Sequence, residues 1–455
     1  MGVQGLPALI KRVAGSSAIQ TYKFSRFNDM KISVDTSLII HQTVIAIRSS
    51  GKDMVNNRGQ LTSHLHGLYY KVLIFLQNGM VPIFVFDGAP PKMKKKTMER
   101  RRDRRMQAET RLKGLSDSEG DEYIKNFKQT FKPTKEHIDE AKILLDLMGI
   151  PYIVAPGEAD VICSWLAARQ DSDKKPYVNG VCSDDSDMLA LGAPYLFKDM
   201  LRFMSRDKMV KVISLNKTLV KMNLTMEQFA NLCALLGTDY CDNIKGVGPV
   251  NAYKLISKYG TLEKVFKFLH KTGKISEHCL DDNSTSNSDD CNTKTNEQCM
   301  IDTRNYFLTA LSEIDESDDF VLTDKQLNLR RFQEDELMDF MCVKHGFDVI
   351  RIKTGIDRLR EYYKIMNVTT KNTSRVHKIL QPISENYIFM ELSPTDIDFL
   401  SSSDEEEMPN KKSTNVPGKK YINVPEKKYI NVPEKSITLP AKKKITSVKK
   451  NSLKN

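Results

Sequence analysis

The hydrophobic pattern of the chain predicts strands and helices in alternation. Short apolar runs rich in β-branched and aromatic residues are separated by amphipathic stretches such as 62–77 and 134–148. The runs predicted to be strands are 30–35, 81–87, 149–155, 179–184, 194–199 and 209–215. Such alternation is typical of α/β proteins. We therefore expect a mainly parallel, twisted sheet that is flanked by helices.

Two polar segments interrupt this pattern. Residues 92–132 are charged but keep a helical periodicity, with a break at 114–122. Residues 281–299 are polar and lack periodicity, which predicts a disordered insertion. A helical pattern then returns at 333–363.

The chain becomes polar again beyond residue 370. A charged linker leads into three eight-residue repeats, NVPGKKYI, NVPEKKYI and NVPEKSIT, which start at Asn415, Asn423 and Asn431. Repeats this short and polar cannot build a core, so we expect a flexible basic tail.

Composition narrows the classes of protein that fit. The chain has 69 Lys and Arg against 58 Asp and Glu, a net charge of +11, which favours a polyanionic partner, although a basic tail alone can produce it. We find no apolar run of membrane-spanning length and no signal peptide. The cysteines form no CxxC pair, which argues against a zinc site or a disulfide framework. A reduced, intracellular protein fits best.

Carboxylates follow most of the predicted strands. They are Asp35, Asp87, Glu158, Asp160, Asp184, Asp185, Asp187 and Asp239. Each one alone could be an ordinary helix cap or turn residue. Ligands of parallel sheets bind at the carboxyl ends of the strands, so these acids are expected at one edge. Clustered hard oxygen ligands indicate divalent cations such as Mg²⁺, and paired cations catalyse phosphodiester hydrolysis.

Five motifs in order carry a family resemblance. They are "MGVQGLPALI", "VFDGAPP", "GIPYIVAPGEAD", "SDDSDML" and "LLGTDYCDNIKGVGP". Together they resemble the flap endonuclease family of structure-specific 5′ nucleases, the xeroderma-pigmentosum-G type, over roughly residues 1–365. The resemblance implies a PIN-like α/β sheet with a helical arch, a helix–two-turn–helix element and a disordered tail.

The resemblance also divides the chain into regions. We expect an N-terminal nuclease region at 1–108, continuation of the cap or arch at 109–132 and an internal nuclease region at 133–270. The helix–two-turn–helix is expected at about 230–262, the disordered insertion at 281–299, the closing helical segment at 300–366 and the basic tail at 370–455.

Seven carboxylates match the metal ligands of the family. They are Asp35, Asp87, Glu158, Asp160, Asp185, Asp187 and Asp239. The resemblance implies two Mg²⁺ ions, or Mn²⁺ in their place. Asp160 stands where close relatives carry Glu, one methylene longer, and Asp184 matches an acid that is not a ligand. Gly2, after removal of Met1, is expected to pack near the active site.

The basic stretch 92–113 can be read as a solvated helix face. The resemblance instead makes it the arch that a 5′ flap threads, with Lys94 and Arg101 as catalytic cations that stabilise developing charge. Other DNA contacts are expected from His41, Arg48 and Lys71. Relatives commonly place a stacking Tyr at the position of His41, and the alternative is a partly buried helix histidine.

The segment 242–260 resembles the helix–two-turn–helix of the family. Glycine turns of this kind point backbone N–H groups at a phosphate. An ordinary helix connection is the alternative. The DNA contacts expected here are Lys245, Gly246, Gly248 and Lys254. The family binds a monovalent cation in this element, so we expect K⁺ at Asn243, Ile244 and Val247.

The leading hypothesis is a Mg²⁺-dependent 5′ flap endonuclease and 5′-to-3′ exonuclease of DNA replication and repair, using two metals on branched DNA with a 5′ flap. The alternatives are a double-strand exonuclease of mismatch repair and recombination, a 5′ exoribonuclease and a catalytically silent DNA-binding scaffold. We expect a monomer without membrane association, in the nucleus first and the cytoplasm second. The tail shows no QxxLxxFF-like peptide that would support binding to a sliding clamp.

Overall fold

The computed structural model describes residues 2–115, 120–201, 209–274, 295–318 and 320–369. The chain divides into two compact units, Met1–Pro382 and Ile383–Asn455, and every described residue belongs to the first. The expected tail and its repeats lie outside the described residues, as does most of the expected insertion.

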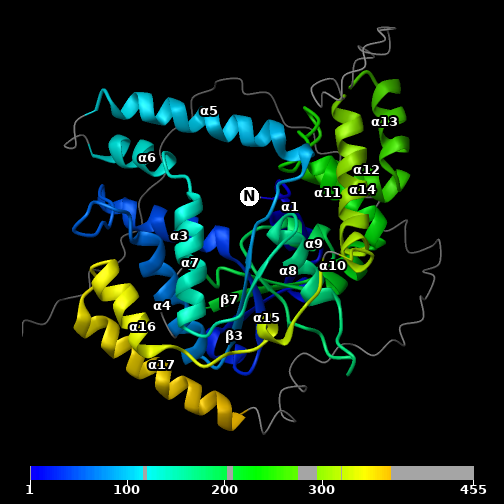
Figure 1. The fold of residues 1–455 in the computed structure, drawn as a ribbon. Helices are drawn as coiled ribbons and strands as arrows, with labels where there is room; N and C mark the ends of the chain where they lie inside the picture. Colours follow the sequence, from blue (N-terminus) through cyan, green and yellow to red (C-terminus); the bar gives the residue numbers. More distant parts are fainter. Residues whose placement is uncertain (1, 116–119, 202–208, 275–294, 319, 370–455) are drawn as a thin grey trace, which may run out of the picture. The chain divides into compact units, whose positions relative to one another are not determined.

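One seven-stranded mixed sheet lies at the centre of the first unit (Figure 1). Its strands, in spatial order, are β1 (Ile19–Lys23), β7 (Met209–Ser214), β6 (Tyr195–Lys198), β5 (Val181–Cys182), β2 (Lys31–Asp35), β3 (Val81–Phe86) and β4 (Tyr152–Val154). Strands β6, β5, β2, β3 and β4 pair in parallel, whereas β7 runs antiparallel to β6 and β1. The mainly parallel sheet and its six expected strands are confirmed.

Among the described residues, β1 is the one strand that the hydrophobic pattern did not predict. Its sequence IQTYK is polar, and none of its residues is fully buried. It forms because its backbone pairs with β7, with Ile19 opposite Ile213. An edge strand needs no continuous apolar run, since its outer side is not covered by another strand.

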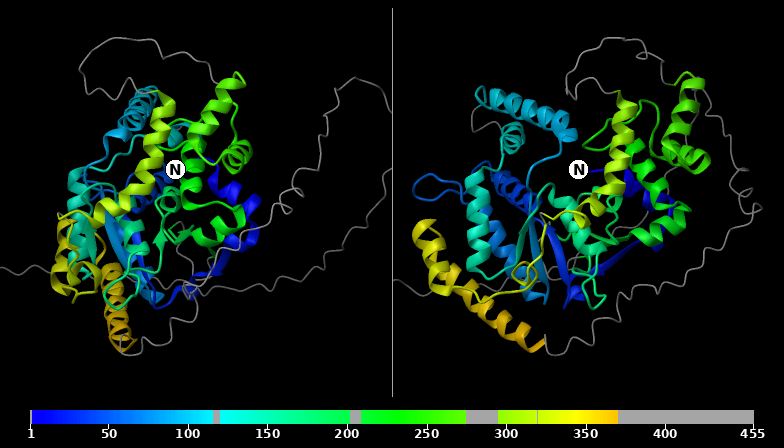
Figure 2. Two further views of the ribbon diagram at one scale, coloured as in Figure 1. Left: turned by 90° about the vertical axis from the view of Figure 1, so that its right-hand side faces the viewer. Right: turned by 45° about the vertical axis from the view of Figure 1, so that its right-hand side comes forward.

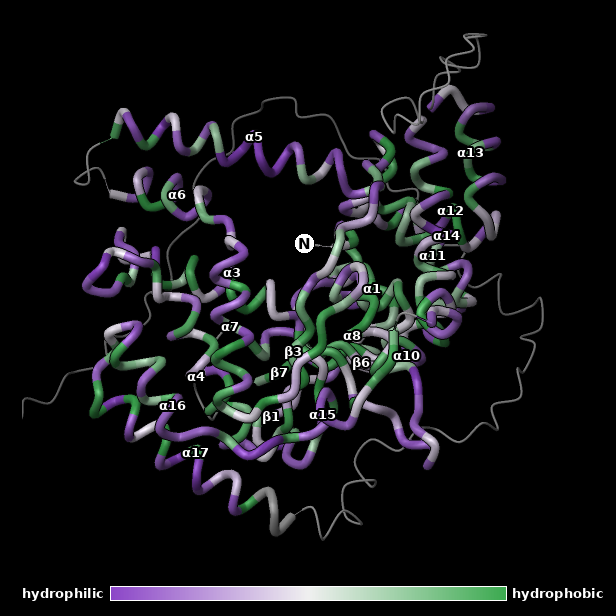
Figure 3. The backbone as a smooth tube through the Cα atoms, viewed as in Figure 1, coloured by the Kyte–Doolittle hydropathy of each residue, from purple (hydrophilic) through white to green (hydrophobic). Residues whose placement is uncertain are grey.

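Alternate residues of the strands pack into two cores. Ile83 and Val85 of β3 join the core on one face, and Phe84 and Phe86 join the core on the other. This period of two is what a strand buried on both sides requires. Figure 3 shows the apolar colouring of the strands inside the helical layers.

Helices cover both faces of the sheet (Figure 2). The first core is formed with α1 (Leu6–Val13), α2 (Gly15–Ala18), α8 (Ala159–Ala168), α9 (Asp187–Ala190), α10 (Leu215–Met222), α11 (Met226–Leu236), α12 (Pro249–Tyr259), α13 (Leu262–Lys271) and α14 (Asn296–Asp315). The second is formed with α3 (Thr36–Ile47), α4 (Ser63–Gln77), α7 (Lys135–Leu147), α16 (Glu334–Met338), the π-helix η4 (Asp339–Lys344) and α17 (Val349–Thr369). The short element η1 (Phe24–Phe27) adds Phe24 and Phe27 to the second core. The other short elements are η2 (Arg48–Ser50), η3 (Lys92–Lys94) and α15 (Asp324–Leu327).

The charged segment after β3 forms two helices, α5 (Lys95–Leu112) and α6 (Asp121–Gln129). They pack against each other away from the sheet (Figure 1). The predicted break at 114–122 starts after α5, residues 116–119 of it lie outside the described residues, and its last two residues begin α6. Figure 3 shows that α5 is hydrophilic along most of its length.

One boundary of the expected insertion was wrong. Residues 296–299 belong to α14, although 281–299 was expected to be disordered. The Thr295 hydroxyl accepts a hydrogen bond from the Gln298 amide, and Glu297 lies in the first turn, so the polar residues start the helix. Within the described ranges, no helix is both long enough and apolar enough to span a membrane.

Candidate active site

The parallel strands bring the expected carboxylates to one edge of the sheet. Asp35 is the last residue of β2, and Asp87 directly follows β3. Asp185 and Asp187 follow β5, the other neighbour of β2. Glu158 follows β4 and is the N-cap residue of α8. Neighbouring parallel strands end on the same side, so their order in the sheet places these acids next to one another.

Two further acids lie outside the strand ends. Asp160 lies in the first turn of α8, and Asp239 lies in the loop after α11. The acids lie close enough to repel one another, Asp160 with Asp185 and Asp35, and Asp187 with Asp185 and Asp239.

Some of these acids also have the ordinary structural roles that the sequence allowed. Asp35 Oδ1 accepts a hydrogen bond from the Leu38 amide at 3.2 Å and so caps α3. Asp87 accepts from the Ser37 hydroxyl at 2.5 Å and from the Ala159 amide at 2.9 Å, at the start of α8. Capping and metal binding are compatible, since each carboxylate has several lone pairs.

The acids are difficult to ionise in this arrangement. Burial, with Asp87 nearby, raises the pKa of Asp35 to about 7. Burial and neighbouring carboxylates also raise the pKa values of Asp160 and Asp187 well above their usual range. Burial raises the pKa of Asp185, although the Asp187 amide opposes this shift. Like charges brought together out of water favour the protonated forms unless cations compensate them.

The donor set fits divalent metal ions. Asp187 is buried, and its Oδ1 atom has no hydrogen-bond partner among the described residues. A buried carboxylate oxygen without a partner is costly, and a hard cation would satisfy it. In the described part of the chain, no three acid, His or Cys side chains converge tightly enough to coordinate one ion as they stand. Several of the acids instead contact the cations of α5 and η3.

Gly2 lies directly against this cluster, as expected. A Cβ atom at Gly2 would stand 1.9 Å from Asp185 Oδ1 and 2.9 Å from Asp187 Oδ1. The residue has φ of +78°, which favours glycine as well. A side chain at this position would displace the two carboxylates.

The two expected catalytic cations contact the acids. The Lys94 ammonium, at the end of η3, pairs with Glu158, and the Arg101 guanidinium of α5 pairs with Asp239. Burial opposes the charge on Lys94, but Glu158 and Asp160 outweigh it and raise its pKa. Lys94 therefore carries its positive charge inside the acidic cluster.

The base of α5 is also attached to the loop after α11. Arg100 donates to both carboxylate oxygens of Asp242, at 2.7 and 2.8 Å, and Lys96 lies 3.3 Å from the same group. Thr97 donates to the Asp239 carbonyl at 2.5 Å. Helix α5, the expected arch, and the segment expected to bind duplex DNA are thus joined by polar contacts.

Asp184 differs from its two neighbours in the SDDSD motif. Its Oδ1 accepts from the Asp199 amide and its Oδ2 from the Gln42 side chain, both at 2.9 Å. These bonds tie the loop after β5 to the end of β6 and to α3. The side chain is engaged within the protein, as are those of Asp35 and Asp87, and its place outside the ligand set stays a prediction.

His41 is exposed on α3. Its ring centroid lies 6.0 Å from that of Phe131. Desolvation and the charge of Arg101 lower its pKa, so the ring is predominantly neutral near pH 7. A neutral exposed ring close to the arch is available for stacking.

Arg48, one of the expected DNA contacts, has internal partners in this structure. It makes two hydrogen bonds to Asp53, at 2.8 and 2.9 Å, and donates to the Phe127 carbonyl and the Thr130 hydroxyl. Its guanidinium carbon lies 4.3 Å from the Phe127 ring centre, and the residue is 8% exposed. Arg48 therefore joins η2 to the end of α6. Lys71 is half-buried on α4 and donates to the Leu201 carbonyl.

The expected helix–two-turn–helix consists of α11, the loop 237–248 and α12. Gly246 has φ of +84° and open space where a Cβ would be, and Gly248 is the N-cap of α12. Lys245 and Lys254 are exposed. Ile244 and Val247 are buried and linked by a 3.0 Å backbone hydrogen bond, while Asn243 is exposed.

Sequence reasoning missed two tyrosines. Tyr240 and Tyr306 both donate to Glu158 Oε2, at 2.5 and 3.0 Å. The position of Tyr240 beside Asp239 could have suggested it. Nothing in the sequence near Tyr306 marks it, because its contact depends on how α14 packs.

Comparisons with known proteins agree with these motifs. The XPG N-terminal domain matches residues 1–108, and the XPG I-region matches residues 149–239. Flap endonuclease 1 of Vanderwaltozyma polyspora is 36% identical over 368 residues, which cover 80% of this chain and 89% of the relative. Flap endonuclease 1 of Homo sapiens is 33% identical over 362 residues, which cover 79% of this chain and 86% of the relative.

Solved structures share the fold. The flap endonuclease-1 of Methanococcus jannaschii aligns with a TM-score of 0.52 at 24% identity, over 77% of this chain and 97% of its own. The catalytic core of Rad2 in complex with DNA substrate aligns with a TM-score of 0.52 at 24% identity, over 79% of this chain and 100% of its own. With the identities above 30% to the curated relatives, the chain belongs to the flap endonuclease family of XPG-type nucleases.

Proposed function

We propose that this protein is a magnesium-dependent, structure-specific 5′ flap endonuclease with 5′-to-3′ exonuclease activity, acting in DNA replication and repair. One observation carries the proposal: carboxylates at the ends of β2, β3 and β5 lie together, and cations from the base of the arch contact the same cluster. Lys94 with Glu158 and Arg101 with Asp239 are the contacts. This combination suits hydrolysis of a phosphodiester, which is an anion that gains charge in the transition state.

Two magnesium ions, or manganese in their place, would activate the attacking water and neutralise charge on the leaving oxygen. The carboxylates proposed to hold them are Asp35, Asp87, Glu158, Asp160, Asp185, Asp187 and Asp239. The unpartnered Asp187 oxygen and the raised pKa values support this assignment, since hard cations favour the ionised acids.

Lys94 and Arg101 are proposed to place positive charge beside the scissile phosphate. Both side chains come from the start of the arch, which is close to the acidic edge of the sheet. Their present partners are Glu158 and Asp239, so a phosphate would compete with these acids for the same cations. Fixed cations next to the reacting group stabilise a developing negative charge without reorganisation.

The remaining surfaces would bind branched DNA. We propose that α5 and α6 guide the 5′ flap and that the exposed ring of His41 stacks on a base. The duplex would be bound by the helix–two-turn–helix through Lys245, Gly246, Gly248 and Lys254, with K⁺ held at Asn243, Ile244 and Val247. The Rad2 core is solved in complex with a DNA substrate and human GEN1 in complex with Holliday junction DNA, which supports a branched substrate here.

The protein is proposed to act as a monomer inside the cell, at the site of DNA replication. A nuclear location is the first expectation, because the curated relatives are flap endonucleases. A sliding-clamp partner is not proposed, because the tail shows no QxxLxxFF-like peptide.

A substrate panel tests this function. The purified protein would be given four 5′-labelled substrates in Mg²⁺: a double flap, a nicked duplex, a flap with an RNA strand and an intact duplex. We expect the double flap to be cut fastest, at the junction. Faster digestion of the nicked duplex end would instead indicate the double-strand exonuclease, and a preference for RNA would indicate an exoribonuclease.

A further inference from the structure

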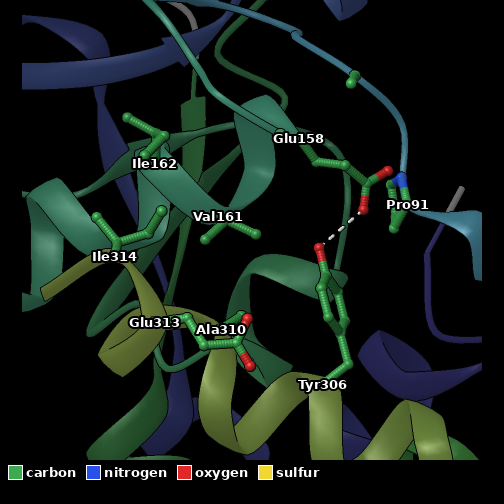
Figure 4. A pocket seen from close by; sticks show the side chains of 10 residues that line it. Pro91, Glu158, Val161, Ile162, Tyr306, Ala310, Glu313 and Ile314 are labelled. Carbon is green, nitrogen blue, oxygen red and sulfur yellow. Dashed lines mark hydrogen bonds between the residues drawn. The ribbon is translucent and has the colours of Figure 1, made fainter. Parts of the chain in front are cut away.

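Two phenols converge on one oxygen of Glu158. Tyr306 of α14 donates to Oε2 at 3.0 Å, and Tyr240 donates to the same atom at 2.5 Å. The other oxygen, Oε1, accepts from the Lys94 ammonium. Figure 4 shows the Tyr306 phenol pointing from α14 to the carboxylate. Both oxygens of Glu158 are therefore oriented by side chains from outside its own helix.

The surroundings of this contact make it strong. Glu158 is 6% exposed, and the pocket beside it is lined by apolar side chains including Val161, Ile162 and Ala310 (Figure 4). A hydrogen bond to a carboxylate is stronger when little water competes for it. The ring centroids of Tyr240 and Tyr306 lie 5.2 Å apart, so the two phenols also support each other.

Helix α14 holds Tyr306 in place because it is bound to α8, the helix that Glu158 begins. The Trp165 indole of α8 donates to Asp315 of α14 at 2.7 Å, and Arg169 makes an ion pair with the same Asp315. Phe307, next to Tyr306, is buried in the core shared by both helices. The Tyr306 phenol and the Glu158 carboxylate are thus held in place by two helices that are bound to each other.

We propose that Tyr306 is a positioning residue, which fixes the Glu158 carboxylate in the orientation that the divalent metal requires. The inference rests on the proposed function, and it adds a residue of the late helix α14 to the support of the metal site. A hydrogen-bonded partner outside the ligand set restricts the rotation of a ligand and raises metal affinity.

The test compares Tyr306→Phe with Tyr363→Phe. Both tyrosines are half-buried, and Tyr363 donates to the Met148 carbonyl at 2.8 Å on the other face of the sheet. Mg²⁺ affinity would be measured without cleavage, from the rise in melting temperature that Mg²⁺ produces in the absence of DNA. The Mg²⁺ dependence of double-flap cleavage is the second readout. Fluorescence of Trp165, which is the single tryptophan of the chain, reports whether α14 is still docked on α8.

We expect Tyr306→Phe to raise the Mg²⁺ concentration for half-maximal effect roughly tenfold in both readouts, the lower end of the usual cost of losing such a partner. The fluorescence of Trp165 and the metal-free melting temperature should stay close to those of the unchanged protein, and Tyr363→Phe should leave the Mg²⁺ dependence unchanged. An unshifted Mg²⁺ dependence in Tyr306→Phe would overturn the inference. So would an equal shift in Tyr363→Phe. If the unchanged protein bound Mg²⁺ but cut no flap, the proposed function would fail while the melting data still tested Tyr306.

Discussion

Arg100 of α5 makes a two-pronged ion pair with Asp242, in the loop between α11 and α12. Hydrogen bonds from Arg100 lower the pKa of Asp242 to about 2, and they outweigh the opposing effect of burial. The ion pair therefore persists as the pH falls to about 4. Both side chains are nearly half exposed. The pair links the element that is proposed to guide the flap with the element proposed to bind the duplex.

Breaking this pair should loosen the arch without unfolding the protein. We expect Arg100→Glu or Asp242→Arg alone to reduce flap cleavage several-fold, and the double variant to recover part of the loss. Exposed pairs are worth about 0.2–1 kcal/mol, so the coupling should lie in that range. A double-mutant cycle on kcat/KM at low and high salt measures it. No recovery in the double variant would mean that the pair does not position the arch.

Arg48 should matter for stability more than for DNA binding. Arg48→Ala removes the pair with Asp53 and the bonds to the end of α6, and leaves Asp53 without its guanidinium partner. The expected loss in the free energy of unfolding is about 3 kcal/mol, as for other buried pairs from which one partner is removed. Urea denaturation measures it, with the exposed Arg26→Ala as control. Unchanged stability together with a large loss of DNA affinity would contradict this prediction and indicate that Arg48 contacts DNA.

The neighbouring acids of the SDDSD motif should respond differently to the same change. Asp185→Asn is expected to lower the cleavage rate by about 100-fold or more, above the usual cost of losing an outer partner of a metal ligand. Asp184→Asn should be mild, because the amide oxygen can still accept from the Asp199 amide. Single-turnover cleavage at saturating Mg²⁺ compares them. Equal cleavage rates for the two variants would contradict the different roles expected for Asp184 and Asp185.

Folding stability in the absence of metal should depend on the pH through Asp35. Its pKa is raised to about 7 in the folded protein, so the group favours the folded state below pH 4 and this contribution is lost as the pH rises to 7. In EDTA, we expect the melting temperature of Asp35→Asn to rise relative to that of the unchanged protein as the pH increases from 5 to 7. Added Mg²⁺ should stabilise the unchanged protein more at pH 7 than at pH 5. Parallel pH profiles for the two proteins would contradict this.

Local sequence patterns predicted much of the fold and little of the support for the site. The strand runs and the acids that follow them could be found because each strand carries its own hydrophobic pattern. Strand β1 could not, since it depends on pairing with β7. Tyr306 and the internal contacts of Arg48 could not either, because they join segments distant in sequence. The start of α14 was missed because capping residues and disordered segments have similar polar composition.

The acids at the sheet edge are proposed to cleave a flapped DNA with the help of a divalent metal. The most direct measurement is cleavage of a 5′-labelled double flap by the unchanged protein and by Asp187→Asn, in Mg²⁺ and in EDTA. We predict cleavage at the junction by the unchanged protein in Mg²⁺, and none in EDTA or by Asp187→Asn. Equal cleavage by both proteins, or undiminished cleavage in EDTA, would contradict the claim.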